Sequence, residues 1–479
     1  MEENPRRSVV ADIPMAMCRL SADGSKIKVT SRSARVCGRV RQLESSHCNE
    51  ALSCTKSNRS IERPWMKIAL LGQFGSGNTG NDGSLEAMLD FLRSSKVDAE
   101  LLCICSNPEA IAKKYNIEAI SIRVIVARGR WFNRFNRILG DIPRQVIGFY
   151  TILAQLNGLD LMIIPGTGIL DDFQETAFGW PFVILRWCLA ARLNRMRIAF
   201  VSIGAGPIRL PLSRLFLKTG ARMAHYRSYR DKLSRDFMKS IGFDVSRDPL
   251  SADLAFGLPA AAESSRENPT AVYVGVGVMA YYGWKKADED GEAIYRTYLD
   301  KIAEFISWLQ ERGLNVRLLT GDIVDRRAVV DIMKMFPENE ANSGSKHIVA
   351  EEMTSLHDVM AQIAHTDIVV ATRYHNVVCA LRMGRPVISL AYSSKNDALL
   401  SATGLEEYCH YVETFDVEVL KSQVEKMLAD RARLVLEVKK GVAGFRAQLA
   451  EQEATIHATL FEIAEQRGEI RDVSQLPQS

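Results

Sequence analysis

The chain has 479 residues, of which 47% are hydrophobic and 25% are charged, so it is long and apolar enough for two or three globular domains. This composition excludes a disulfide-stabilised miniprotein, a collagen-like fibre and a wholly disordered chain. The net charge of +4 lies mostly in residues 1–65, with 12 basic against 7 acidic side chains, and the near-neutral remainder argues against a nucleic-acid-binding protein.

Residues 1–65 are rich in serine, arginine and asparagine and lack sustained periodicity, so we expect a disordered or weakly ordered extension. From Met66 onward, short apolar runs alternate with amphipathic stretches. The apolar runs predict strands at Ile68–Leu71, Glu100–Cys105, Leu161–Ile164, Ile198–Ser202 and Ala224–Ser228. The amphipathic stretches predict helices at Ser84–Ser94, Phe182–Leu193 and Lys232–Ile241. Apolar strands that alternate with helices indicate a parallel sheet covered on both faces, here an N-terminal α/β lobe over residues 66–260.

A second unit of the same kind follows a composition break at Pro259–Pro269. Its predicted strands are Val272–Val278, Val316–Thr320, Ile368–Ala371 and Val387–Ala391. Its predicted helices are Tyr295–Arg312, Arg326–Met335, Leu356–Ala364 and His375–Met383, and a charged helical segment runs from Val417 to about Glu465. We assign a C-terminal α/β lobe to residues 268–425 and closing helices and a tail to residues 426–479. The expected fold is therefore α/β, with two Rossmann-like parallel-sheet lobes facing a cleft in which a ligand binds at the carboxyl ends of the strands.

Cysteine usage and hydropathy predict a cytoplasmic protein. The nine cysteines are an odd number without CxxC spacing, which favours a reducing compartment without structural disulfides or a metal site. The most apolar stretch, Val146 to Ile164, is interrupted by Gln155, Asn157 and Asp160, so we expect no membrane span. Charges recur through residue 41, which argues against a signal peptide.

Three glycine-rich turns follow predicted strands of the N-terminal lobe. They are Gly72–Gly83, the turn of Gly166 and Gly168, and the turn of Gly204 and Gly206. Glycine lets a backbone turn tightly and approach a ligand closely, and a following helix start offers free N–H groups. In the first turn the glycine spacing is only a weak match to the Rossmann pattern at a strand end, and no Gly-Lys-Ser or Gly-Lys-Thr sequence of a P-loop follows. A purely structural role for each turn stays open.

The sequence Arg373-Tyr374-His375 lies where a predicted strand meets a predicted helix. A helix N-terminus carries roughly half a positive charge, so an arginine and a histidine there predict an anion pocket. The histidine would titrate near neutral pH and would act as a general acid once an anion has raised its pKa.

Two further cations and one aromatic loop are candidates for the same pocket. Arg230 lies between a predicted strand and a helix and could clamp a carboxylate or phosphate, with pairing to Asp231 as the alternative. Lys395 follows the next predicted strand and could bind phosphate as a point charge, with a solvated lysine as the alternative. Tyr281, Tyr282 and Trp284 crowd one loop, where they could stack on a sugar or pack on their neighbours.

Together these motifs resemble the polysaccharide pyruvyl transferase family over residues 66–411. The resemblance rests on Gly77-Asn78-Thr79-Gly80, Gly166–Gly168, Gly204-Ala205-Gly206-Pro207, Tyr229-Arg230-Asp231 and Arg373-Tyr374-His375 with Lys395. It implies a fold similar to that of two-lobed glycosyltransferases of the B type. It also implies transfer of a pyruvyl group from phosphoenolpyruvate to two hydroxyls of a sugar, giving a pyruvate ketal and phosphate, without a metal or a further cofactor.

The resemblance also implies roles for individual residues. Arg373 and Arg230 would bind carboxylate and phosphate, His375 would be the acid, and Lys395 would assist at the phosphate. The substrate-binding residues would be Gly77, Asn78, Gly80, Gly166, Gly168, Gly204, Gly206, Tyr374 and Lys395. The chain departs from the family pattern at Asn81, which shifts Asp82 by one position, and at Thr167, which replaces a common glycine.

Two other functions stay open from the sequence: a nucleotide-sugar-dependent glycosyltransferase of the same fold, and a carbohydrate-binding relative without catalysis. The sequence also leaves open the acceptor sugar of an exopolysaccharide precursor, whether that sugar is lipid-linked, and whether the protein is a homo-oligomer. Because the N-terminal extension is basic, a peripheral position at the inner face of the membrane stays open too.

Overall fold

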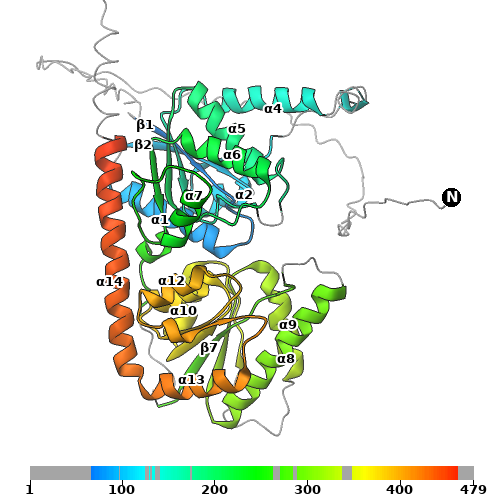
Figure 1. Ribbon diagram of the computed structural model, residues 1–479, viewed down its shortest axis with the longest axis vertical. Coiled ribbons are helices and arrows are strands. Elements are labelled where there is room, and N and C mark those ends of the chain that lie inside the picture. The colour runs from blue at the N-terminus through cyan, green and yellow to red at the C-terminus, as the bar shows by residue number, and fades with distance from the viewer. Residues whose placement is uncertain are drawn as a thin grey trace, which may run out of the picture. The chain divides into compact units, whose positions relative to one another are not determined.

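The computed structural model describes residues 66–95, 98–124, 129, 132–134, 141–172, 175–262, 270–283, 289–336 and 348–461. Within these residues the chain forms two six-stranded sheets whose pairings are all parallel, and helices cover the sheets (Figure 1). The predicted α/β class with two Rossmann-like parallel sheets is confirmed. The extension at residues 1–65, predicted to be disordered, lies outside the described residues.

The N-terminal sheet has the strand order β3-β2-β1-β4-β5-β6. Its strands are β1 (Met66–Leu71), β2 (Ala99–Cys105), β3 (Glu118–Ser121), β4 (Leu161–Pro165), β5 (Arg197–Ile203) and β6 (Tyr226–Tyr229). Its helices are α1 (Thr79–Ser94), α2 (Pro108–Tyr115), α4 (Ile142–Gln155), α5 (Trp180–Leu193), α6 (Pro211–Arg222) and α7 (Lys232–Ser240). The expected strands are all present, and α2, α4, α6 and β3 are elements that the apolar periodicity did not indicate.

The C-terminal sheet has the strand order β12-β11-β10-β7-β8-β9. Its strands are β7 (Tyr273–Gly277), β8 (Asn315–Leu319), β9 (Ile348–Val349), β10 (Ile368–Ala371), β11 (Val387–Ala391) and β12 (Cys409–Tyr411). The helices that accompany them are α8 (Glu289–Glu311), α9 (Arg326–Met335), α10 (Leu356–Ala364), α11 (Tyr374–Arg382), α12 (Lys395–Ser401) and α13 (Val417–Ala429). A short 3-10 helix, η1 (Leu254–Gly257), precedes this sheet in the chain.

Alternating side chains of the buried strands supply two cores. In β1, Ile68 and Leu70 belong to the core that continues through α1 into the C-terminal sheet. Ala69 and Leu71 belong to the second core, which fills the space between the N-terminal sheet and helices such as α4 and α5. Because both faces of the strand are buried from Ile68 onward, its sequence is apolar from Ile68 to Leu71, as expected for a covered parallel sheet.

Each sheet has a point at which the strand order reverses. In the N-terminal sheet this point lies between β1 and β4, and in the C-terminal sheet it lies between β7 and β10. Loops that follow neighbouring strands on either side of such a point diverge and leave room for a ligand. The loops concerned are the glycine-rich turns after Leu71 and Pro165 and the segment after Ala371 that contains Arg373 and His375.

The charged helical segment expected from Val417 to about Glu465 consists of α13 and a separate helix, α14 (Arg431–Ile456), with Asp430 between them. Helix α14 packs against α11 and η1, and Gln452 near its end hydrogen-bonds to Ser202 and Ser228 of the N-terminal sheet. One helix therefore contacts elements of both sheets. Among the described helices, none combines the length and the apolar composition that spanning a bilayer requires. The division of the chain into domains at residues 260 and 268 stays a prediction.

Candidate active site

The four cationic candidates lie at carboxyl ends of parallel strands. Arg230 follows β6, Arg373 and His375 follow β10, and Lys395 follows β11 and begins α12. All of these loops meet the edge of a sheet at which ligands of open α/β folds bind. Their contacts show which of them come together.

Arg373 is held by a buried carboxylate. Its Nε donates to Asp325 Oδ2 at 2.8 Å, and its Nη2 donates to Asp325 Oδ1 at 2.7 Å. Asp325 is fully buried and also accepts backbone N–H groups of Ala280 and Gly321. The side chain of Arg373 keeps 15% of its surface exposed, so part of it remains accessible to a ligand.

Arg230 is buried between a carboxylate and an aromatic ring. Its Nη1 donates to Asp253 Oδ2 at 2.8 Å, and its guanidinium lies over the ring of Tyr374, 4.6 Å from the ring centre. The Asp231 pairing weighed from the sequence is longer, at 3.6 Å from Arg230 Nε. Arg230 Nε has no hydrogen-bond partner among the described residues. A buried N–H without a partner costs free energy, which an anionic oxygen of a ligand would recover.

His375 lies in the first turn of α11 and shares Asp253 with Arg230. Its Nε2 is 3.8 Å from Asp253 Oδ2 and has no hydrogen-bond partner among the described residues, and its ring meets Tyr374 edge to face. The pKa of His375 is lowered to about 4, chiefly by burial. The Asp253 carboxylate opposes this lowering, and Arg230 and Arg373 contribute to it. The expectation that this histidine titrates near neutral pH is therefore corrected: the imidazole is neutral at pH 7, because burial and two neighbouring cations outweigh the Asp253 carboxylate and disfavour its charged form.

The depressed pKa of His375 predicts a pH dependence of stability. The unfolded chain binds a proton at about pH 6.5 and the folded chain only at about pH 4, so stability is fully present above the unfolded pKa and is lost as the pH falls through this window. Between pH 7 and pH 5 the loss from this one group is about 2 kcal/mol. Urea unfolding of wild type and His375→Gln at both pH values measures it. Equal pH dependence of the two proteins would contradict the assignment.

Lys395 lies near Arg230 and the second glycine turn. Its Nζ is 3.6 Å from the point at which a β-carbon on Gly168 would lie. Burial lowers the pKa of Lys395, Arg230 lowers it further, and Asp171 and Asp231 raise it. The positive charges of Arg230 and Lys395 therefore repel one another, although the two residues follow strands of different sheets.

The first glycine turn contacts the C-terminal sheet directly. Helix α1 begins at Thr79 rather than at Ser84, with the Asn78 side chain capping it by accepting the N–H groups of Gly80 and Asn81. Asn78 also donates to Asp322 at 3.1 Å, and the hydroxyl and the N–H of Thr79 both donate to the carbonyl of Gly321. Five of the twelve residues of the predicted loop, from Thr79 to Gly83, are thus helical, and the bonds of Asn78 and Thr79 to Asp322 and Gly321 hold the start of this helix.

Gly80 allows the approach of α1 to His375. A β-carbon on Gly80 would lie 1.9 Å from His375 Nδ1, well inside contact distance. We expect Gly80→Ala to displace the imidazole and to lower both stability and activity. Gly444→Ala is the matched control, because Gly444 is an α14 residue with open space around it, and this change should raise stability by up to about 1 kcal/mol. Thermal unfolding and turnover of both variants test this; unchanged turnover in Gly80→Ala would contradict it.

The other predicted glycines divide into two groups. Gly204 lies beside the cations, since a β-carbon there would be 3.0 Å from Arg230 Nε. Gly77, Gly166 and Gly206 instead face packed side chains, and their φ angles of 97°, 60° and 75° are ones that other residues rarely adopt. The structure thus brings Gly80 next to His375, Gly168 next to Lys395 and Gly204 next to Arg230, and the remaining three glycines adopt positive φ angles in turns.

The two departures from the family pattern have structural consequences. Asp82 accepts the N–H of Gly75 at 2.7 Å and is largely buried, which raises the pKa of its carboxyl group. Thr167 adopts a φ of 62°, which is strained for a β-branched residue, and its carbonyl accepts the N–H of Gly204 at 2.6 Å. Asp82 therefore stabilises the first glycine turn by its bond to Gly75, and Thr167 connects the turn of Gly166 and Gly168 to the turn of Gly204 and Gly206.

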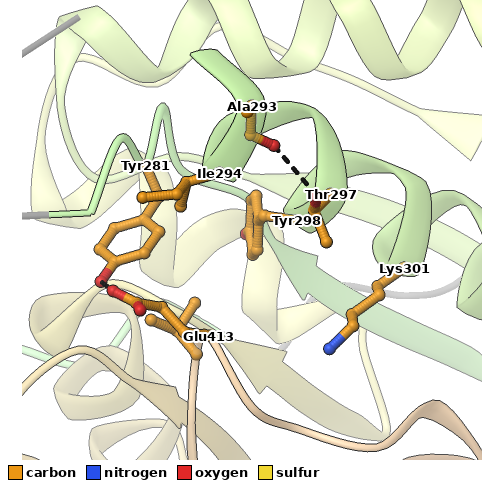
Figure 2. A pocket seen from close by; sticks show the side chains of 8 residues that line it. Tyr281, Ala293, Ile294, Thr297, Tyr298, Lys301 and Glu413 are labelled. Atoms are coloured by element: carbon orange, nitrogen blue, oxygen red, sulfur yellow. Dashed lines mark hydrogen bonds between the residues drawn. The ribbon is translucent and has the colours of Figure 1, made fainter. Parts of the chain in front are cut away.

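The aromatic loop is packed against its neighbours. Tyr281 is buried and donates its hydroxyl to Glu413 at 2.6 Å, and Tyr282 packs on Tyr295, while Trp284 lies outside the described residues. Tyr281 and Glu413 line a cavity of about 260 Å³ between α8 and the chain after β12, together with Ala293, Ile294, Thr297, Tyr298, Lys301 and Val412 (Figure 2). Tyr298 and Lys301 also form hydrogen bonds, to Thr372 and to the carbonyl of Phe415. Tyr281, Tyr298 and Lys301 of this cavity therefore already have hydrogen-bond partners within the protein.

Sequence reasoning missed two residues of this site, Asp253 and Asp325. Asp253 caps η1 and contacts both Arg230 and His375, and Asp325 pairs with Arg373. Asp253 lies 23 residues from Arg230, and Asp325 lies 48 residues from Arg373, so no local pattern joins either aspartate to its arginine. Only an expectation that buried arginines need carboxylate partners would have prompted a search for them.

Comparison with known proteins adds to this geometry. A family model described as polysaccharide pyruvyl transferase matches residues 78–394, two thirds of the chain, and this span includes Arg230, Arg373 and His375. A search of curated proteins finds no match.

Several solved structures of other proteins resemble the chain. A protein from Listeria monocytogenes described as a UDP-N-acetylglucosamine 2-epimerase is 11% identical with a TM-score of 0.51, covering 78% of this chain and 90% of that one. The UDP-GlcNAc 2-epimerase of Methanocaldococcus jannaschii is 11% identical with a TM-score of 0.49 over 75% of this chain and 92% of that one. MurG of Acinetobacter baumannii is 13% identical with a TM-score of 0.46 over 79% and 95%. The predicted likeness to B-type glycosyltransferase folds is confirmed, and because the family model covers more than half of its length, the chain belongs to the polysaccharide pyruvyl transferase family and is a transferase.

Proposed function

We propose that the protein transfers the pyruvyl group of phosphoenolpyruvate to two hydroxyls of a sugar in a polysaccharide or its precursor, forming a pyruvate ketal and releasing phosphate. The observation that carries this proposal is the pair of nitrogen atoms, Arg230 Nε and His375 Nε2, that are buried beside Asp253 and lack partners among the described residues. An anion with hydrogen-bonding oxygens would satisfy the first and would charge the second.

The cations suit a small donor with two anionic groups. Phosphoenolpyruvate carries a carboxylate and a phosphate, which planar guanidinium groups bind with paired hydrogen bonds. We assign these groups to Arg373 and Arg230, with Lys395 as a point charge at the phosphate. The pairing of each arginine with a buried aspartate fixes its orientation before the donor arrives.

His375 supplies the proton in this proposal. Negative charge on the donor raises the pKa of the neutral imidazole, which takes up a proton and delivers it to C3 of the enolpyruvyl group. One sugar hydroxyl then attacks the cationic C2, and the second hydroxyl displaces phosphate from C2. C3 gains one proton, each hydroxyl loses one, and the released phosphate accepts the proton left over.

We place the acceptor along the turns that contain Gly168 and Gly204, because these lie next to Lys395 and Arg230. In this proposal the first glycine turn, with Gly77, Asn78 and Gly80, lines the site where the two sheets contact each other. We further propose that the reaction takes place in the cytoplasm on an exopolysaccharide precursor.

The test is incubation of the protein with phosphoenolpyruvate and a panel of lipid-linked and nucleotide-linked sugars. Phosphate should be released only when a suitable sugar is present, and mass spectrometry should find the pyruvyl ketal on that sugar. Thermal shifts provide a second measurement, because phosphoenolpyruvate should stabilise the protein. Stabilisation by a nucleoside diphosphate, together with glycosyl transfer and no ketal, would overturn the proposal in favour of a glycosyltransferase.

A further inference from the structure

The outer surface of helices α4, α5 and α6 exposes many large apolar side chains. Of the eighteen such side chains exposed among the described residues, ten lie between residues 142 and 215. The most exposed are Phe178 at 69%, Tyr150 at 68%, Ile142 at 65%, Leu193 at 59% and Leu215 at 56%. Single exposed apolar residues are ordinary, but a concentration of this kind marks an interaction surface.

These side chains form one continuous surface, which we call the α4–α6 surface. Phe178, Phe182 and Phe216 lie with ring centres 5.5 to 5.8 Å apart and join the start of α5 to α6. Arg186 of α5 stacks on Phe182 and donates to Gln145 of α4 at 2.7 Å. The three helices also lie next to one another in the ribbon (Figure 1).

The charges on the α4–α6 surface have a single sign. The three helices contain six basic residues and no aspartate or glutamate. The basic residues are Arg144, Arg186, Arg192, Arg214, Lys218 and Arg222. The exposed Arg123 and Arg134, which precede α4, add to them. The flanking carboxylates lie at helix starts, where Asp141 pairs with Arg144 and Glu175 accepts the N–H of Trp180.

We propose that the α4–α6 surface docks on an anionic lipid bilayer. Apolar and aromatic side chains that enter the interface, surrounded by arginines that face lipid phosphates, are the chemistry of surface-bound amphipathic helices. A second copy of the chain fits less well, because a two-fold contact would bring like charges together. Nucleic acid fits less well too, because the exposed side chains are largely aliphatic.

The α4–α6 surface also reaches the edge of the sheet at which the cationic residues lie. Phe178 and Leu212 lie at the start of α5 and α6, and helix starts in parallel α/β units lie near the carboxyl ends of the preceding strands. If the proposed function holds, this position presents the site to a sugar whose lipid carrier is anchored in the same bilayer. The docking inference itself rests only on the surface.

The experiment is co-sedimentation of the full-length protein with vesicles of phosphatidylcholine alone and of phosphatidylcholine with about a quarter phosphatidylglycerol. Binding should favour the anionic vesicles and should weaken as salt is raised. The variant Tyr150→Ser/Leu193→Ser should lower the partition coefficient about tenfold. The variant Arg144→Gln/Arg222→Gln should abolish the preference for anionic lipid.

Matched controls come from α14. Leu436 is 69% exposed, and Leu436→Ser should bind as wild type does, as should Lys439→Gln/Lys440→Gln. Because every variant keeps residues 1–65, their basic charge cannot account for a difference. Equal binding of all variants, or equal binding to both vesicle types, would overturn the inference. A fall in solution mass of Tyr150→Ser/Leu193→Ser from a dimer to a monomer would overturn it in favour of self-association.

Discussion

His375→Gln should lower kcat by about 10²- to 10⁴-fold, the range that removal of a general acid covers, while the protein stays folded. Folding should survive because Nε2 of this histidine has no hydrogen-bond partner among the described residues, so the change removes no bond that stabilises the fold. Acceptor-dependent phosphate release and thermal unfolding measure the two quantities separately.

His357→Gln is the control for this variant. His357 lies on α10, and its imidazole forms a hydrogen bond of 2.6 Å with Glu86 of α1, a residue outside the candidate site. Its replacement should cost about 1 kcal/mol of stability and leave kcat within a few-fold of wild type. Turnover of His375→Gln equal to that of His357→Gln would remove His375 from the catalytic step.

Arg373→Met should both inactivate and destabilise the protein. It leaves the fully buried Asp325 without its charged partner, which costs about 3–5 kcal/mol of unfolding free energy. Because loss of activity could follow from unfolding alone, stability and activity have to be separated. The double variant Arg373→Met/Asp325→Asn removes the unpaired charge and should recover at least about 1 kcal/mol while kcat/KM stays at least about 100-fold below wild type.

Arg227→Met supplies the matched comparison. Arg227 forms the same two-bond pairing with a buried carboxylate, Asp248, at 2.9 Å for each bond, but it faces Phe243 and not the cationic residues. Urea unfolding should show a similar loss of stability, and turnover of the folded fraction should be normal. Full turnover in Arg373→Met/Asp325→Asn would show that Arg373 serves only to hold the loop after β10.

The sequence was sufficient to predict the two-sheet architecture, because buried parallel strands appear in it as continuous apolar runs. Both faces of a central strand are buried, so Leu161–Ile164 is apolar at every position and Val387–Ala391 is apolar at every position except Ser389. Both segments stand out against the amphipathic helices. The glycine turns and Arg373-Tyr374-His375 could also be found, since each directly follows such a strand. The apolar pattern did not indicate α4 and α6, and several of their large apolar side chains are exposed, among them Ile142, Tyr150 and Leu215.

The resemblance in local motifs also identified the family, which needed no coordinates. Local sequence did not indicate where the glycine turn ends, because Thr79 becomes helical through bonds to Gly321, 242 residues away. Nor could it give the protonation of His375, which depends on burial and on Arg230, a residue of the other half of the chain.

What the sequence alone determined was thus which residues end the strands and which chemical groups they carry. What only the tertiary structure decided was their partners: Asp253 for Arg230 and His375, and Asp325 for Arg373. The physical reason is that a buried charge is stabilised by the group that folding brings within hydrogen-bond distance. Both that distance and the burial depend on residues far away in the sequence, so local sequence does not predict them.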